Sequence, residues 1–206
     1  MIITELAASG KTKFKVYIDY EYAFMLSAKE VKLYGLEEEY QITDVLYSEI
    51  LNETILPKAK LKAMDLLKSM DRTEYELVAK LRASGFAEAI CQEALAYVKK
   101  FNYVNDYRYA CNYIQYRKTT KSQKMIQMEL SRKGVDKSLI NEAFEEEYQE
   151  ATEEEAVRRE VKKKCKNVED LTYEKRMKIS ASLYRKGFSS SVVRKVLGDL
   201  SFYDEA

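Results

Sequence analysis

The sequence predicts a mainly α-helical protein, in which three tandem three-helix repeats form an elongated, curved array behind a small N-terminal β-meander. Three observations predict this fold. One third of the 206 residues are charged, while the chain has only six Gly and one Pro, and this balance is typical of helices. From Pro57 onward the apolar residues recur with helical spacing. A pattern of Leu, Gly and an apolar residue also occurs three times in that part of the chain.

The N-terminal segment, residues 1–56, has a different hydrophobic period from the rest. Residues 2–6 and 22–26 are apolar runs, and residues 13–18 alternate between polar and apolar side chains. A polar, Gly-containing turn at residues 9–12 separates the first two runs. These features predict three short antiparallel strands in a meander.

Short helices are expected between the meander and the first repeat. Ser27 and Glu30 have the spacing of a capping box at the start of a helix, and Gly35 suits the residue that ends it. A second short helix is expected from about residues 43–44. Pro57 suits the first turn of a new helix, because the N–H group that it lacks has no partner there.

Each repeat contains a Gly that follows a Leu by four residues and directly precedes an apolar residue. The three sets are Leu81, Gly85 and Phe86, then Leu130, Gly134 and Val135, then Leu183, Gly187 and Phe188. Apolar residues follow at five, six, nine and ten positions beyond each Gly, which is one stripe of an α-helix. Because Gly adopts positive φ without a Cβ penalty, we expect each of the three to end one helix shortly before the next begins.

The spacing of these glycines leaves room for three helices in each repeat. The expected domains are residues 57–103, 104–150 and 151–206, behind the segment 1–56. The expected helices are 56–69, 73–84 and 87–101, then 106–117, 122–133 and 136–150, then 152–166, 172–186 and 189–200. Asp136 and Ser189 are good N-cap residues for the last helix of their repeats, whereas Ala87 is not.

The composition excludes several classes of enzyme. The chain has no His, which removes Ser-His-Asp and Cys-His catalysis and His-containing zinc sites. Cys91, Cys111 and Cys165 have no CxxC spacing and are expected to be small buried thiols of a reducing compartment. The Gly positions allow neither common phosphate-binding loop, and no apolar run is long enough to span a membrane. We therefore expect a cytoplasmic, monomeric binding protein without catalytic residues, metal or cofactor.

Charge is distributed unevenly along the chain. Residues 1–56 hold five Lys and ten acidic residues, while each of the segments 57–150 and 151–206 has a net charge of +3. Two basic runs, at 117–133 and 158–166, flank an acidic run at 145–155. Such runs indicate either solvated helix faces braced by ion pairs one turn apart, or a bipolar surface that recognises a charged polymer or protein assembly.

Tyrosine is unusually frequent, with seventeen Tyr against seven Phe. Tyr109, Tyr113 and Tyr116 recur at helical spacing and would share one face just before the first basic run. One interpretation is a core face with the phenol oxygens at its edge. The other is a contact surface with the neighbouring cations, because Tyr and Arg are enriched at interface hot spots and Tyr also stacks on unpaired bases.

Several segments resemble the repeated elements of the RecX family. Residues 71–81 and the following Gly-Phe resemble the element Arg-Ser/Thr-x-x-Glu-Leu-x-x-Lys-Leu…Gly. Residues 101–110 resemble the link Asp-x-x-Tyr/Phe-Ala, and residues 118–135 resemble the element Ile-x-x-Glu-Leu-x-x-Lys-Gly-Ile/Val. The third repeat lacks the Glu-Leu pair but keeps Leu, Lys, Gly and Phe within residues 183–188.

The resemblance implies a regulator of the RecA recombinase. Such a protein would bind the RecA filament on DNA and modulate its ATPase, recombination and SOS-related activity without a cofactor. It would do so by inhibiting ATP hydrolysis and strand exchange or by promoting filament disassembly. From the residues alone an alternative stays open, a helical-repeat protein that binds DNA directly and competes for the strand. The candidate partner-binding residues are Tyr113, Tyr116, Arg117, Lys118, Lys121, Lys124, Arg132 and Lys133.

Overall fold

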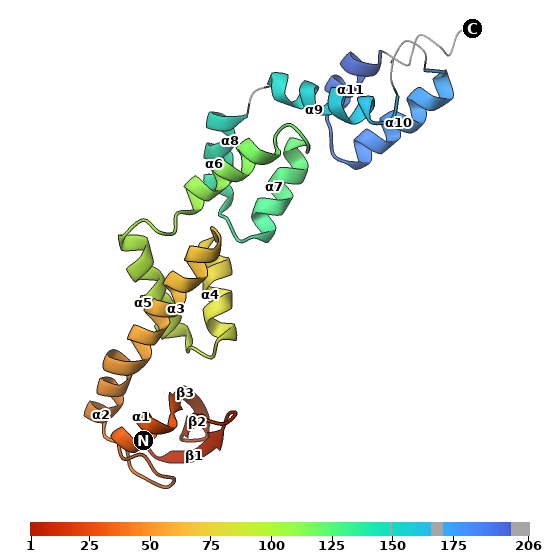
Figure 1. Ribbon diagram of the computed structural model, residues 1–206. Coiled ribbons are helices and arrows are strands. Elements are labelled where there is room, and N and C mark those ends of the chain that lie inside the picture. The colour runs from red at the N-terminus through yellow and green to blue at the C-terminus, as the bar shows by residue number, and fades with distance from the viewer. Residues whose placement is uncertain (149, 166–170, 199–206) are drawn as a thin grey trace. The chain divides into compact units, whose positions relative to one another are not determined.

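The computed structural model describes residues 1–148, 150–165 and 171–198. The chain forms two compact units, Met1–Asn105 and Asp106–Ala206. Unit 1 contains the N-terminal sheet and the first repeat, and unit 2 contains the second and third repeats (Figure 1). The fold is therefore the expected one, helical repeats behind a short β-meander.

The N-terminal sheet is an antiparallel meander of β1 (Ile3–Ala8), β2 (Lys13–Ile18) and β3 (Glu21–Ser27), in that order. Val16 of β2 lies opposite Leu6 on one side and Phe24 on the other. The turn between β2 and β3 places Asp19 and Tyr20 at positive φ, the conformation that two-residue hairpin turns require. The predicted meander is confirmed. The positive φ angles of this turn were not predictable, because neither of its two residues is a Gly or Asn.

The short helices also lie where expected. In α1 (Ala28–Leu33), Ser27 and Glu30 form the reciprocal capping box, and Gly35 follows the helix at φ 61°. Thr43 caps α2 (Asp44–Glu49) by accepting a hydrogen bond from a backbone N–H.

A continuous helix replaces the expected break before the first repeat. α2 passes through the π-helical segment η1 (Ile50–Ile55) into α3 (Leu56–Ser69). Pro57 does lie in the first turn of α3, but no loop precedes it. Pro has no N–H to donate, and the wider hydrogen-bonding pattern of a π-helical turn accommodates such a gap inside a helix.

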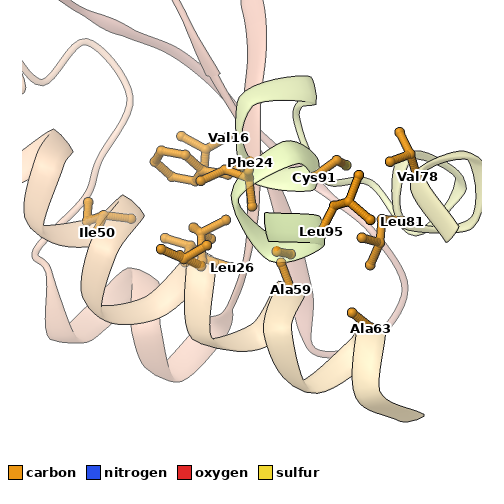
Figure 2. Close-up of a cluster of buried hydrophobic side chains, with 14 of the residues drawn as sticks. Val16, Phe24, Leu26, Ile50, Ala59, Ala63, Val78, Leu81, Cys91 and Leu95 are labelled. Carbon is orange, nitrogen blue, oxygen red and sulfur yellow. The ribbon is translucent and has the colours of Figure 1, made fainter. Parts of the chain in front are cut away.

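The sheet and the first repeat share one hydrophobic core. Besides α3, this repeat contains α4 (Glu74–Ala83) and α5 (Glu88–Lys100). Phe24 from β3, Ile50 from η1, Ala59 from α3 and Leu95 from α5 are all buried in this core (Figure 2). Residues 1–56 therefore pack together with the first repeat in a single unit.

Unit 2 contains two further sets of three helices. The second repeat has α6 (Asp106–Arg117), α7 (Gln123–Arg132) and α8 (Lys137–Glu147). The third has α9 (Glu150–Lys162), α10 (Tyr173–Arg185) and α11 (Ser190–Leu197). All nine expected repeat helices are present. The ends predicted at residues 166 and 200 lie outside the described residues.

The predicted apolar stripe forms the cores of the repeats. The Leu four residues before each Gly is fully buried in all three copies. The residue ten positions after each Gly is at most 8% exposed; these are Leu95, Phe144 and Leu197. The prediction for the thiols holds for Cys91, which is buried, whereas Cys111 and Cys165 are only half-buried.

Candidate partner-binding surface

Three glycines end the middle helix of their repeats as predicted. Gly85, Gly134 and Gly187 have φ of 90°, 81° and 81°. The N–H of the following residue donates to the carbonyl of the Leu that lies four residues before the Gly, at 3.2–3.3 Å in each copy. This is the hydrogen-bond pattern of a Schellman motif, which requires the left-handed conformation that Gly adopts most easily.

The last helices of the repeats begin in three different ways. Asp136 accepts a hydrogen bond from the backbone N–H of Ser138 at 2.8 Å, as expected, and Ala87 forms no side-chain cap. Ser189 occupies the N-cap position of α11 but forms no side-chain cap there, so that expectation was wrong. Its N–H and hydroxyl instead donate to the carboxylate of Glu153 on α9, at 3.0 and 3.2 Å. The N-cap residue of α11 is therefore held by the Glu153 carboxylate, which lies 36 positions earlier in the chain.

Aromatic rings and cations alternate along one edge of α6. The Tyr109 and Tyr113 rings stack with centroids 6.1 Å apart. The Arg117 guanidinium lies 5.7 Å from the Tyr113 centroid and 5.3 Å from that of Tyr116, and the Lys133 ammonium lies 5.5 Å from Tyr109 and 5.9 Å from Tyr113. We call these five residues the tyrosine–cation cluster. Cations at such distances are attracted by the ring faces.

The structure places the tyrosines of the cluster in two different environments. Tyr109 and Tyr113 are half-buried and pack against the core of the second repeat. Tyr116 is 77% exposed and contributes its ring to the surface. The cluster is therefore anchored at one end and accessible at the other.

Glu129 of α7 links the cluster to Lys121. The Tyr113 hydroxyl donates to the Glu129 carboxylate at 2.8 Å, and Lys121 forms an ion pair with the same carboxylate. Burial opposes ionisation of Glu129, but the hydrogen bonds from Lys121 and Tyr113 outweigh it and lower the pKa of Glu129. Burial and the neighbouring carboxylate together raise the pKa of Tyr113. The carboxylate therefore stays charged and neutralises Lys121.

The remaining candidate residues point to other parts of unit 2. Lys118 donates to the Glu147 backbone carbonyl at 2.9 Å, at the end of α8. Lys124 lies where the third repeat contacts α7. A Cβ atom added to Gly187 of the third repeat would lie 3.3 Å from the Lys124 Cβ. Arg132 is exposed on the last turn of α7. The predicted basic patch therefore divides into two parts. Arg117, Lys121 and Lys133 lie in or beside the tyrosine–cation cluster, whereas Lys118, Lys124 and Arg132 lie outside it.

The second and third repeats meet at the N-terminus of α7. Ser122 is fully buried, accepts a hydrogen bond from the N–H of Met125, and donates its hydroxyl to the Lys186 carbonyl at 2.6 Å. A groove of about 240 Å³ beside this contact has Met125 and Phe188 among its lining residues. Lys121 and Glu129 also line the groove, and the hydrogen bond from Tyr113 to Glu129 links this lining to the tyrosine–cation cluster.

The basic and acidic runs of the third repeat pair with each other. Glu154 binds Arg158 at 2.7 Å and Lys195 at 2.6 Å. Glu160 binds Lys163 at 2.5 Å and also forms an ion pair with Lys186. The pairs with Arg158 and Lys163 join residues one turn apart on α9 and at its C-terminal end, as in a braced helix face. The pairs with Lys195 and Lys186 instead join α9 to α11 and to the end of α10.

Across residues 1–148, 150–165 and 171–198, the acidic and thiol side chains form no group of three that could hold a metal ion. In the same part of the chain, no helix combines the length and apolar character of a membrane span.

The comparisons with known proteins match the three repeats one by one. Models of the first, second and third three-helix domains of RecX match residues 59–97, 105–143 and 152–197. The chain belongs to the RecX family. Within this family, Regulatory protein RecX of Caldanaerobacter subterraneus subsp. tengcongensis is 34% identical over 199 residues, which cover 96% of this chain and 98% of the relative. That of Clostridium acetobutylicum is 31% identical, with 96% and 95% covered.

Solved RecX structures share the fold. A crystal structure of regulatory protein RecX covers 97% of this chain and 100% of its own, with a TM-score of 0.67 and 23% identity. The structure of RecX from Lactobacillus salivarius covers 71% of this chain and 97% of its own, with a TM-score of 0.59 and 25% identity. Both curated relatives are named as regulatory proteins.

Proposed function

We propose that this chain binds the filament that the RecA recombinase forms on DNA, and inhibits its ATP hydrolysis, strand exchange and SOS-related activity. Membership of the RecX family supports this proposal. A tandem-repeat fold also supports it, because such folds offer long binding surfaces more often than catalytic pockets. Inhibition by binding needs no cofactor or catalytic residue. We further propose that the protein acts as a monomer in the cytoplasm.

The tyrosine–cation cluster is the observation that carries the proposed contact. The Arg117 guanidinium lies 5.7 and 5.3 Å from the ring centroids of Tyr113 and Tyr116, and contact with two rings restricts its movement before a partner arrives. A side chain that is already ordered loses less conformational entropy on binding. Tyr and Arg are also the residues that most often dominate interface energies. We therefore assign the main contact to this cluster instead of the whole basic run.

The ion pairs of unit 2 refine the choice of contact residues. Lys121 and Lys118 each have a carboxylate within ion-pair distance, Glu129 and Glu147 respectively. Reversing their charge would disturb those pairs and confuse a loss of binding with a loss of structure. Tyr116 is the better target, because it is the most exposed member of the cluster.

The test is ATP hydrolysis by RecA on single-stranded DNA, titrated with this protein, beside a gel-shift titration of the same DNA without RecA. We expect inhibition at concentrations well below those that shift the DNA. If activity falls only in parallel with the DNA shift, the protein competes for the strand, and direct DNA binding replaces our proposal.

A single substitution connects the activity to the cluster. We expect Tyr116→Ala to raise the half-inhibitory concentration about tenfold, as hot-spot truncations of about 1.4 kcal/mol do. Tyr75→Ala is the matched control, because Tyr75 is also an exposed helical tyrosine, at 62%, but lies on α4 in the first repeat. Equal effects of the two substitutions would contradict the assignment to the cluster.

A further inference from the structure

A second hollow in unit 2 is lined by cations and lies apart from the tyrosine–cation cluster. Thr119, Glu155, Arg158, Arg159 and Lys162 line a cleft of about 300 Å³. Four of these residues come from α9, and Thr119 comes from the turn after α6. The cleft shares no lining residue with the tyrosine–cation cluster.

The two sides of the cleft are joined by a hydrogen bond. Arg159 donates from Nη1 to the Thr119 hydroxyl at 3.3 Å. Glu155, Arg159 and Lys162 are spaced by four and three residues, which places them on one face of α9. A guanidinium, an ammonium and a hydroxyl therefore converge on one space.

The surroundings of the cleft carry surplus positive charge. Arg158 donates two hydrogen bonds to Glu154, at 3.0 and 2.7 Å, and Lys195 binds the same carboxylate. Both cations together lower the pKa of Glu154, Lys195 more strongly. Glu160 likewise has two cations, Lys163 and Lys186. Because each of these carboxylates already has two partners, neither neutralises Arg159 or Lys162.

The donor set suits an oxyanion with several acceptor oxygens. A guanidinium fork binds two oxygens of one phosphate, and an ammonium or hydroxyl can bind a third. Glu155 lowers the net charge of the cleft, so we expect modest affinity that falls steeply with added salt.

We propose that this cleft binds a phosphate group, supplied by a nucleic-acid backbone or by a free nucleotide. The proposal does not depend on the recombinase contact, since its ligand binds without recombinase. A failure of either proposal can therefore be recognised separately.

The test measures direct binding by the full chain without RecA. Fluorescence anisotropy of a labelled single-stranded oligonucleotide gives its affinity across a salt series, and competition with ATP and with inorganic phosphate gives theirs. The test variant is Arg159→Gln with Lys162→Gln. The matched control is Lys175→Gln with Lys178→Gln, because these exposed lysines of α10 do not line the cleft. Circular dichroism verifies that each variant is folded.

The test variant should bind the oligonucleotide about tenfold more weakly, while the control should change far less. Its slope of log affinity against log salt should fall by roughly 0.7, because the loss of one phosphate contact removes about 0.7 for a single strand. If millimolar ATP or phosphate displaces the oligonucleotide from the parent, the cleft takes free phosphate compounds as well. If neither competes, it takes the nucleic-acid backbone. Equal weakening in both variants, or no binding of any probe by the parent, would overturn the proposal.

Discussion

The helix ends at Gly85 and Gly187 share one local motif but have different neighbours. At Gly85, the Tyr22 hydroxyl from β3 donates to the Gly85 carbonyl at 2.5 Å. At Gly187, the Ser122 hydroxyl from the second repeat donates to the Lys186 carbonyl at 2.6 Å. A hydroxyl from a neighbouring module thus donates to a backbone carbonyl at each of these two helix ends. The repeated sequence pattern specifies the glycine side of each contact but not the hydroxyl side.

Neighbouring atoms would lie closer to a Cβ on Gly187 than to one on Gly85. A Cβ on Gly187 would lie 3.0 Å from the Ser122 Oγ and 3.3 Å from the Lys124 Cβ. A Cβ on Gly85 would meet the Tyr22 hydroxyl at 3.2 Å, which is the far end of a long side chain. The contact at Gly187 thus has less room to adjust, and substitutions should be more damaging there.

The largest effect is expected for Gly187→Val. A β-branched residue is strained at φ 81°, and its Cβ would collide with Ser122. We expect unit 2 to lose about 3 kcal/mol of stability. Native-state hydrogen exchange of α7 and α10 measures this loss, with the amides of unit 1 as the internal control. A change below about 1 kcal/mol would mean that the repeats separate easily at this point.

Ser122→Ala tests the other side of the same contact. The substitution removes both the N-cap of α7 and the donor to the Lys186 carbonyl. We expect a loss of about 2 kcal/mol, from about 1 for the cap and about 1 for the buried acceptor left without a partner. Thr43→Ala is the control for the cap alone, because the Thr43 hydroxyl accepts a hydrogen bond at the start of α2. Denaturant unfolding followed by hydrogen exchange would show whether α7 and α10 lose protection together.

Gly134→Val tests the backbone conformation in the second repeat. Its φ of 81° strains any β-branched residue, so we expect a loss on the order of 1 kcal/mol or more. Gly134→Asn is the control, because Asn tolerates the left-handed region better. If the valine variant is as stable as the parent, this helix end does not hold the left-handed conformation.

The smallest effect is expected for Tyr22→Phe. It removes only the phenol hydroxyl that donates to the Gly85 carbonyl, at a site that solvent partly reaches. A loss of about 0.5–1 kcal/mol in unit 1 follows from the net value of one hydrogen bond. Thermal unfolding of Tyr22→Phe beside Tyr17→Phe, a second tyrosine of the sheet, would isolate the contact. A loss as large as that of Ser122→Ala would contradict the difference between the two helix ends.

The features that were predictable from the sequence depend on neighbours along the chain. The helices, their glycine ends and the capping box of Ser27 and Glu30 involve residues within one or two turns of each other, so spacing reveals them. The polar partners of Lys118 and Ser189 were not predictable in this way, because they lie far away in the sequence. Glu147 is 29 positions from Lys118, and Glu153 is 36 positions from Ser189. Only the packing of α8 against α6 and of α11 against α9 brings these groups together, so the basic run was predicted as a single patch.

The tyrosines show a similar limit. Their spacing predicted a shared face, and the rings of Tyr109 and Tyr113 do stack. Spacing alone could not show that Tyr116 is exposed while the other two are half-buried. Likewise, the π-helical turn that joins α2 to α3 has no motif in the sequence.

The continuous helix of residues 44–69 has a mechanical consequence. At 1.5 Å per residue it is roughly 39 Å long, and it contributes Ile50 and Ala59 to the core shared by the sheet and the first repeat. A force applied to the sheet would therefore reach the first repeat through continuous helix, with no intervening loop. Any bending of this connection should occur at the π-helical segment and Pro57, where helices usually kink.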